Sequence, residues 1–260
     1  MNTKMNTLKT KETVAKSYCQ DEQELRVDLA AAYRLIHYYE MTDMIYGHIS
    51  LRINEEPPIF LLNPYGLMFD EVCASNLVAV DENGNKIDPT AADVNPAGFT
   101  IHSAIHLRRP HAQVVLHTHT VSGMAVAAME EGLLPLNQIS MAFYNRVAYH
   151  DYEGISLDLD ERERIFASIG QKNFLIMKNH GLLTVGRTVA EAFYYMYYLN
   201  KACEIQVNVL RSGTKPIIPP PEVCEHAARQ YEGSTCDSEI VATWSANLRL
   251  LDRLDPSYRQ

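Results

Sequence analysis

The run HAQVVLHTHT, residues 111–120, joins a short apolar segment to two histidines, His117 and His119. Successive side chains of a β-strand point to opposite faces, so two imidazoles that are two positions apart are predicted to share one face. Imidazole nitrogens bind Zn²⁺, Fe²⁺, Co²⁺ and related ions. The pattern therefore predicts a metal site. The alternative is a pair of core histidines hydrogen-bonded to the backbone, but burying two unsatisfied imidazoles is costly, which favours a shared ion.

A third ligand is predicted at His180, in the run KNHGLL of residues 178–183. This histidine follows the predicted strand FLIMK and precedes a glycine, and the ends of strands are where α/β sheets build their sites. A site with three histidines keeps coordination positions open for other molecules. Open positions are typical of catalytic metals rather than structural ones.

The hydrophobic periodicity of the rest of the sequence predicts alternating helices and strands. Helices are expected at residues 22–40, 95–109, 121–130, 158–169, 188–211 and 222–253. Strands are expected at residues 47–53, 59–63, 113–119, 173–181 and 182–186, with a β-hairpin over 76–88 that turns at 82–85. The stretch between the helix at 121–130 and residue 158 is expected to be irregular. This order predicts a three-layer α/β/α sandwich around a mixed, largely antiparallel central sheet.

The domain organisation expected from the pattern is simple. Residues 1–21 carry lysines without an apolar stretch and are expected to form a flexible lead that is not a secretory signal. Residues 22–215 are expected to form the main domain. The Pro-rich run 216–221 is the only candidate boundary, and residues 216–260 are expected to form a C-terminal helical arm packed on the same domain.

Composition narrows the function classes. The 260 residues include 47% hydrophobic and 21% charged residues, and the net charge is -9, which argues against binding nucleic acid or anionic membranes. No apolar run approaches the roughly 20 residues that span a bilayer. The five cysteines are odd in number, widely spaced and without a C-x-x-C pair, which favours a reduced, cytoplasmic location.

On its motifs the chain resembles the class II aldolase/adducin family, over about residues 25–215. The matching segments are GHISLR (47–52), NPYGL (63–67), HSAIHLRRPHAQVVLHTHT (102–120), VAYHDYEGI (147–155), KNHGLLTVG (178–186) and EAFYYMYYLNKACEIQV (191–207). The resemblance implies the three-layer fold and one divalent metal on His117, His119 and His180. Zn²⁺ is the first choice, with Fe²⁺, Mn²⁺ or Co²⁺ as alternatives. It also implies a small-molecule substrate and a homotetramer.

Departures from the family's sugar-phosphate aldolases are equally informative. Their general acid/base glutamate falls at Gly98 in this chain, and their two phosphate-binding serines fall at Pro96 and Ala97. Glycine carries no proton to move, and Pro96 lacks even a backbone N–H. The usual asparagine of the first motif is His48. A phosphosugar aldolase is therefore not expected.

Five further residues are candidate site residues. His48 and Tyr144 are the catalytic candidates: His48 as a base, a hydrogen-bond donor or a further ligand, and Tyr144 as a phenol that supplies a proton. Asn63, Gly66 and Gly98 are the substrate-binding candidates. For Tyr144, as for Tyr149 and Tyr152, the plainer alternative is aromatic packing with a solvated hydroxyl. His102 and His106 share one helix face, and His102 is expected to be structural.

Two functions from different classes remain open. The first is a metal-dependent lyase, or an iron-dependent oxidative decarboxylase, acting on a small carbonyl or carboxylate compound. The decarboxylase enters because the run MAFYNRVAYHDYEGISLDLDE (141–161) is similar to non-haem iron oxygenases of aminocoumarin biosynthesis. The second is a non-catalytic, adducin-like binding or assembly module whose metal is structural or vestigial.

Overall fold

The computed structural model describes residues 21–156, 158 and 160–260. Within them one sheet has the strand order β3-β2-β1-β4-β7-β6-β5. The strands are β1 (His48–Glu55), β2 (Pro58–Leu62), β3 (Val78–Asp81), β4 (Val114–Thr118), β5 (Val147–His150), β6 (Phe174–Met177) and β7 (Gly181–Gly186). Every neighbouring pair is antiparallel except β5 and β6, which run parallel. The predicted mixed, largely antiparallel sheet is confirmed.

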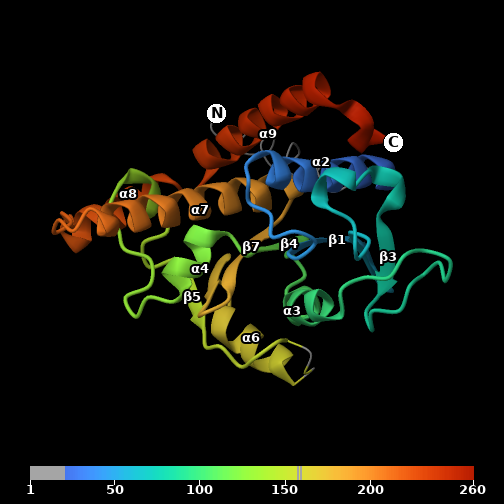
Figure 1. The fold of residues 1–260 in the computed structure, drawn as a ribbon, viewed down its shortest axis with the longest axis horizontal. Helices are drawn as coiled ribbons and strands as arrows, with labels where there is room; N and C mark the ends of the chain where they lie inside the picture. Colours follow the sequence, from blue (N-terminus) through green and yellow to red (C-terminus); the bar gives the residue numbers. More distant parts are fainter. Residues whose placement is uncertain (1–20, 157, 159) are drawn as a thin grey trace, which may run out of the picture.

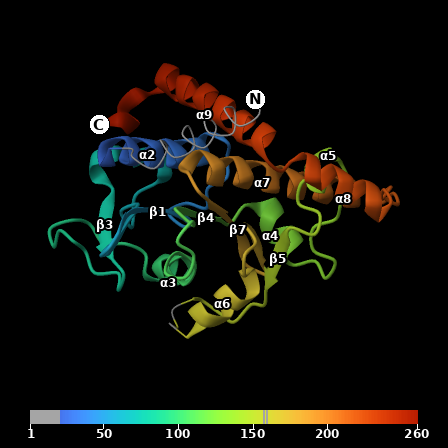
Figure 2. The same ribbon diagram turned by 180° about the vertical axis from the view of Figure 1, so that it is seen from behind.

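Helices cover both faces of this sheet. They are α2 (Glu22–Tyr38), α3 (Pro96–His106), α4 (Val121–Ala127), α5 (Gln138–Met141), α6 (Glu161–Ile169), α7 (Val189–Arg211), α8 (Pro221–Gln230) and α9 (Ser234–Leu254). Short 3-10 helices lie at η2 (Phe69–Glu71), η3 (Ala74–Asn76) and η4 (Pro256–Arg259). Figures 1 and 2 show α2 and α7 on one face, with α9 outside them, and α3 and α6 on the other. The three-layer α/β/α sandwich is therefore confirmed.

The two faces of β4 contribute to two different cores. Leu116 packs in the core beneath α2 and α7. Its neighbour Val115 packs instead with Ile101 and Ile105 of α3. Because side chains alternate along a strand, His117 follows Val115 to the face that α3 covers. The alternation thus places the first predicted ligand in the layer between the sheet and α3.

Helix α3 begins where the sequence predicts. The side chain of Asn95 accepts a hydrogen bond from Ala97 N at 3.1 Å, and Pro96 occupies the first helical turn, where its missing N–H costs nothing. The helix ends at His106, earlier than the predicted residue 109. His102 and His106 are both almost fully buried, so the polar edge of this helix faces the sheet rather than solvent.

The expectation of an irregular stretch before residue 158 is wrong. That stretch contains α5 and the edge strand β5, which pairs in parallel with β6. The four residues of β5 are too few to show a period, and three of their four side chains are buried, so they do not alternate. The predicted hairpin is also shorter than expected, since the return arm after β3 forms only the isolated bridge Val80–Lys86.

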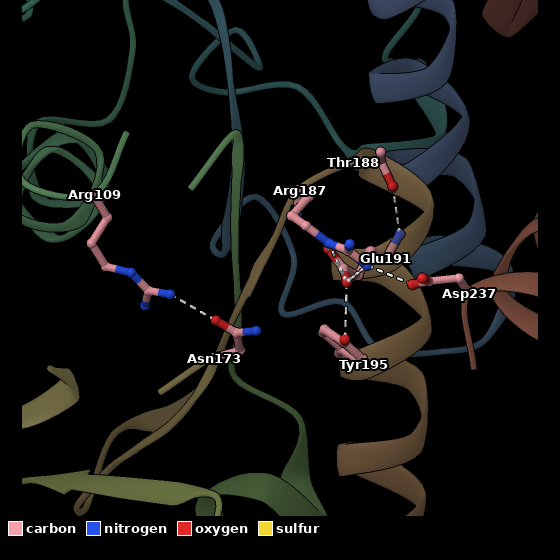
Figure 3. Close-up of polar contacts among 7 residues, drawn as sticks. All are labelled: Arg109, Asn173, Arg187, Thr188, Glu191, Tyr195 and Asp237. Atoms are coloured by element: carbon pink, nitrogen blue, oxygen red, sulfur yellow. Dashed lines mark hydrogen bonds and ion pairs between the residues drawn. The ribbon is translucent and has the colours of Figure 1, made fainter. Parts of the chain in front are cut away.

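The C-terminal helix α9 packs against α2 and α7. An ion-pair network connects α7 to α9. Arg187, just before α7, donates to Glu191 Oε1 of α7 at 2.7 Å and to Asp237 Oδ1 of α9 at 2.6 Å (Figure 3). The part of the predicted N-terminal lead at residues 1–20 lies outside the described residues. Among the described residues, no helix combines the length and apolar character needed to cross a membrane.

Candidate metal centre

Three histidines from distant parts of the chain converge at one end of the sheet. His117 lies in β4, His119 follows that strand directly, and His180 lies in the turn between β6 and β7. Because β7 pairs with β4, this turn lies next to the end of β4. His119 Nε2 lies 2.8 Å from His117 Nε2 and 3.0 Å from His180 Nε2. The possible ligand atoms of all three lie within 4.8 Å of one another.

In two of these rings, the hydrogen bond made by Nδ1 determines which ring nitrogen carries the proton. His117 Nδ1 donates to the carbonyl of Leu182 at 2.9 Å, and His119 Nδ1 donates to Asp43 Oδ2 at 3.0 Å. A carbonyl and a carboxylate can only accept, so both rings carry their proton on Nδ1 and leave Nε2 bare when neutral. Burial, with His180 and His119 nearby, lowers the pKa of His117 well below its usual range. Burial likewise lowers the pKa of His180 to about 4.

This donor set fits a divalent cation. When both rings are neutral, the bare Nε2 lone pairs of His117 and His119 face each other at 2.8 Å and repel unless a positive charge lies between them. His180 Nε2 lies 3.0 Å from His119 Nε2 on the same side. Nitrogens bound tetrahedrally to Zn²⁺ at 2.0–2.1 Å would be roughly 3.3 Å apart, close to the observed spacing. The acceptors behind His117 and His119 are the partners that metal-ligating histidines usually have. The geometry therefore suits the predicted ligands.

The backbone around His180 has little freedom. A Cβ atom on Gly181 would lie 2.5 Å from Thr118 O and 3.2 Å from His117 Cε1. Asn179, on the other side, has the left-handed backbone conformation with φ of 56°. Glycine is required at 181 because the turn approaches β4 closely, and this approach brings His180 to the site.

His48 lies beside the three histidines. It is the partner of His117 in the β1–β4 ladder, and the two ring centroids are 5.0 Å apart. The ring is buried, and burial lowers the pKa of His48 well below its usual range. Gly98 lies against it, since a Cβ atom at 98 would be 2.5 Å from His48 Cδ2. The structure thus brings two of the candidate residues, His48 and Gly98, together at the centre.

The candidates Asn63 and Gly66 lie in different surroundings. Asn63 is buried, and its Oδ1 accepts from the hydroxyl of Tyr33 in α2 at 2.8 Å, on the other face of the sheet. Gly66 has a φ of 97° with open space around it, so its turn conformation already accounts for glycine. Among the described residues, no interaction connects either position to the three histidines.

Of the three tyrosines named from the sequence, Tyr152 is the one near the centre. Its ring centroid is 6.4 Å from that of His180, and the side chain is half exposed. Tyr144 lies in the turns before β5 and lines a hollow with Tyr149 and Lys172. Within the described part of this chain, no contact connects Tyr144 to the histidines.

Two residues that were not predicted hydrogen-bond to histidines here: Asp43 to His119 of the cluster, and Ser50 to His102 beside His48. Asp43, the partner of His119, lies in the segment before β1, where no periodicity marks it. Ser50 stands two positions after His48, and its hydroxyl lies 2.6 Å from His102 Nδ1. The H-x-S spacing on one strand was the available signal for Ser50, because it places both side chains on one face.

Known proteins share this fold and these motifs. The profile of the Class II Aldolase and Adducin N-terminal domain matches residues 27–207. A Caulobacter vibrioides protein assigned by name to aldolase class 2 is 48% identical over 237 residues, which cover 91% of this chain and 92% of that protein. Alpha-adducin of Rattus norvegicus is 45% identical over 219 residues, which cover 83% of this chain but only 29% of the adducin.

Among solved structures, an aldolase II superfamily protein from Pseudomonas syringae superposes with a TM-score of 0.87. It is 47% identical, and the match covers 92% of this chain and 96% of that one. The sequence profile, the identity to full-length relatives and the shared architecture agree. The chain belongs to the class II aldolase/adducin family.

Proposed function

We propose that this protein is a metal-dependent enzyme of the lyase type that acts on a small carbonyl or carboxylate compound. The observation that carries the proposal is the convergence of three Nε2 atoms, two of them in rings whose Nδ1–H is held by a fixed acceptor. A purely structural cluster of histidines would not need two bare nitrogens that face each other beside a third imidazole nitrogen. Because relatives in this family are typically oligomeric, we expect the working form to be an oligomer, and we propose that it is a tetramer.

The residues divide the chemical work. His117, His119 and His180 would hold the ion, and Asp43 would orient His119. A divalent ion bound there supplies a Lewis acid that polarises a substrate oxygen. His48, buried beside His117, would accept or deliver the proton that bond cleavage requires.

A phosphosugar substrate fits poorly. The start of α3 offers Pro96 and Ala97, which have no side-chain hydrogen-bond donor, and Pro96 has no N–H either. At Gly98 there is no acid, and the ring of His48 occupies the space that a side chain would need. The substrate we propose is therefore unphosphorylated, with two adjacent oxygens that suit a metal with open positions.

The identity of the ion separates two reactions. With Zn²⁺, the first choice, we propose carbon–carbon bond cleavage, epimerisation or decarboxylation without oxygen. With Fe²⁺, three neutral imidazoles leave positions for a bidentate substrate and O₂, which favours oxidative decarboxylation of an aromatic keto or hydroxy acid.

A second candidate function rests on the 45% identity to rat alpha-adducin over most of this chain. In that case the chain is a binding or assembly module, and its metal supports the fold without turnover. This candidate predicts that removal of the metal unfolds or dissociates the protein. The enzyme predicts instead a folded, oligomeric protein that has lost activity.

The deciding measurement is the metal content of anaerobically purified protein, compared between wild type and His117→Ala. His226→Ala is the matched control, because His226 is exposed on α8. The proposal expects about one Zn or Fe per chain in wild type and control and none in His117→Ala. Turnover is then screened with carbonyl acids, with and without O₂. Turnover by metal-free His117→Ala would refute the proposal, as would a wild type that binds no metal after reconstitution.

A further inference from the structure

A continuous chain of hydrogen bonds runs from the end of α3 to His48. His106 Nδ1 lies 2.8 Å from the carbonyl of Ala112, and His106 Nε2 lies 2.7 Å from Ser50 Oγ. The same Ser50 oxygen lies 2.6 Å from His102 Nδ1. His102 Nε2 then lies 2.7 Å from His48 Nδ1. Four side chains from two elements thus form one buried polar line ending beside His117.

The fold explains why these side chains meet. His48 and Ser50 are two positions apart on β1 and share a face, while His102 and His106 are one helical turn apart on α3. Packing α3 over β1 therefore interleaves the two pairs. Each of the four residues is at most 4% exposed, so water cannot replace a hydrogen-bond partner that is removed from this line.

The carbonyl at one end gives the chain a direction. Ala112 O can only accept, so His106 carries its proton on Nδ1 and accepts at Nε2 from the Ser50 hydroxyl. Having donated its single proton, Ser50 accepts from His102 Nδ1–H. His102 then accepts at Nε2, which requires the donor to be His48 Nδ1–H.

The direction of these hydrogen bonds requires neutral rings at His102 and His106, and both are buried. Burial lowers the pKa of His102 well below the usual range and that of His106 to about 3. Every side-chain nitrogen and oxygen of these four residues makes a hydrogen bond except His48 Nε2, for which no hydrogen-bond partner exists among the described residues. That atom lies at the Gly98 side of the ring.

We propose that His102, Ser50 and His106 are positioning residues that hold His48 in the tautomer with Nδ1 protonated and Nε2 bare. The bare nitrogen is then ready to accept a proton from a bound substrate. This use of Nε2 rests on the proposed function, whereas the tautomer itself does not. The chemical class implied for the substrate is a compound with an acidic O–H or C–H beside its carbonyl group.

The test reads the tautomer directly, with no substrate present. Two-dimensional ¹H–¹⁵N spectra of protein labelled at histidine distinguish protonated from bare ring nitrogens. Wild type and Ser50→Thr, which keeps the hydroxyl, are expected to show His48 protonated on Nδ1 alone. In Ser50→Ala the buried His102 Nδ1 has no acceptor. The cheaper arrangement then reverses the His102–His48 bond and moves the His48 proton to Nε2.

A second pair of variants probes the far end of the chain. His106→Gln can still accept from Ser50 through its amide oxygen and should preserve the wild-type pattern, whereas His106→Leu should not. A Ser50→Ala protein that keeps His48 wholly in the Nδ1-protonated form would overturn the proposal. His48 protonated on Nε2 in the wild type would also overturn it.

Activity gives a separate readout once a substrate is found. Loss of the tautomer should lower kcat at least about tenfold with KM little changed, and Ser50→Thr should restore it. If no substrate is ever turned over, the proposed function fails while the spectra still decide the tautomer. If turnover is normal in Ser50→Ala despite a changed tautomer, the positioning role fails while the enzyme stands.

Discussion

A Cβ atom on Gly98 would lie 2.5 Å from Cδ2 of His48, a distance that packed carbon atoms do not adopt. The strand residue and the helix residue are thus complementary: the imidazole occupies the volume that any larger residue at 98 would fill. The residues at 48 and 98, where the sequence departs from the sugar-phosphate aldolase pattern, therefore constrain each other sterically.

The first prediction concerns Gly98→Ala. Helix propensity alone would make this change stabilising by about 1 kcal/mol, but the clash with the ring should reverse the sign and cost about 1–3 kcal/mol. Urea unfolding measures the difference in the free energy of unfolding. In a double-mutant cycle with His48→Ala, the cost should largely disappear. Strictly additive changes would show that the two residues do not compete for space.

The second prediction concerns the orientation of a ligand. Asp43→Ala removes the acceptor behind His119 Nδ1 and should weaken metal affinity by about 10–100-fold, as losses of such partners usually do. Asp43→Asn keeps an acceptor oxygen without the charge and should lose less. Competition titration with a metal chelator measures both. Equal affinity in Asp43→Ala and wild type would mean that the backbone alone places His119.

The third prediction is a pH dependence of stability. The folded pKa of His106 is about 3, depressed by burial, against about 6.5 when unfolded. The unfolded chain therefore binds the extra proton first, so stability is complete above pH 6.5 and falls as the pH drops towards 3. At pH 5 this one group should cost about 2 kcal/mol. Urea unfolding at several pH values should show a shallower decline for His106→Gln than for wild type or the exposed-site control His226→Gln.

The fourth prediction concerns the ion-pair network beside α7 (Figure 3). Glu191 is only 3% exposed, whereas Arg187 is about half exposed. Arg187→Met would leave a buried carboxylate without its cation and should destabilise the protein by about 3 kcal/mol. Adding Glu191→Gln should recover most of that loss, while Asp237→Asn alone should cost less than about 1 kcal/mol. Thermal and urea unfolding measure all three, and an unrecovered double variant would refute this account.

Local patterns in the sequence were sufficient to predict the layers but not the order of the strands. Alternation and helical spacing identify the segments and their buried faces, because those signals depend only on near neighbours. The short strand β5 escaped because its four residues, Val147–His150, show no alternation. No local signal says that β1 lies beside β4 rather than beside another strand.

The site divides in the same way. The H-x-H spacing predicted His117 and His119, and a strand end predicted His180, because each signal is local. Asp43 comes from a segment without periodicity, and its role appears only when the chain has folded. Tyr152, rather than Tyr144, lies near the centre. The sequence offered no means of choosing between them, since both fall in the stretch before residue 158 that its pattern predicts to be irregular.

The position of β4 between β1 and β7 has a consequence for how the protein is made. The strand at residues 114–118 pairs on one side with residues 48–51 and on the other with residues 182–186, so the centre of the sheet consists of pairings between distant parts of the chain. Such high contact order slows folding, because the entropy cost of closing the long loops comes before the distant contacts can stabilise the fold. A growing chain cannot complete the histidine cluster until residue 180 has been synthesised, and a fragment that ends before residue 180 would lack the third histidine.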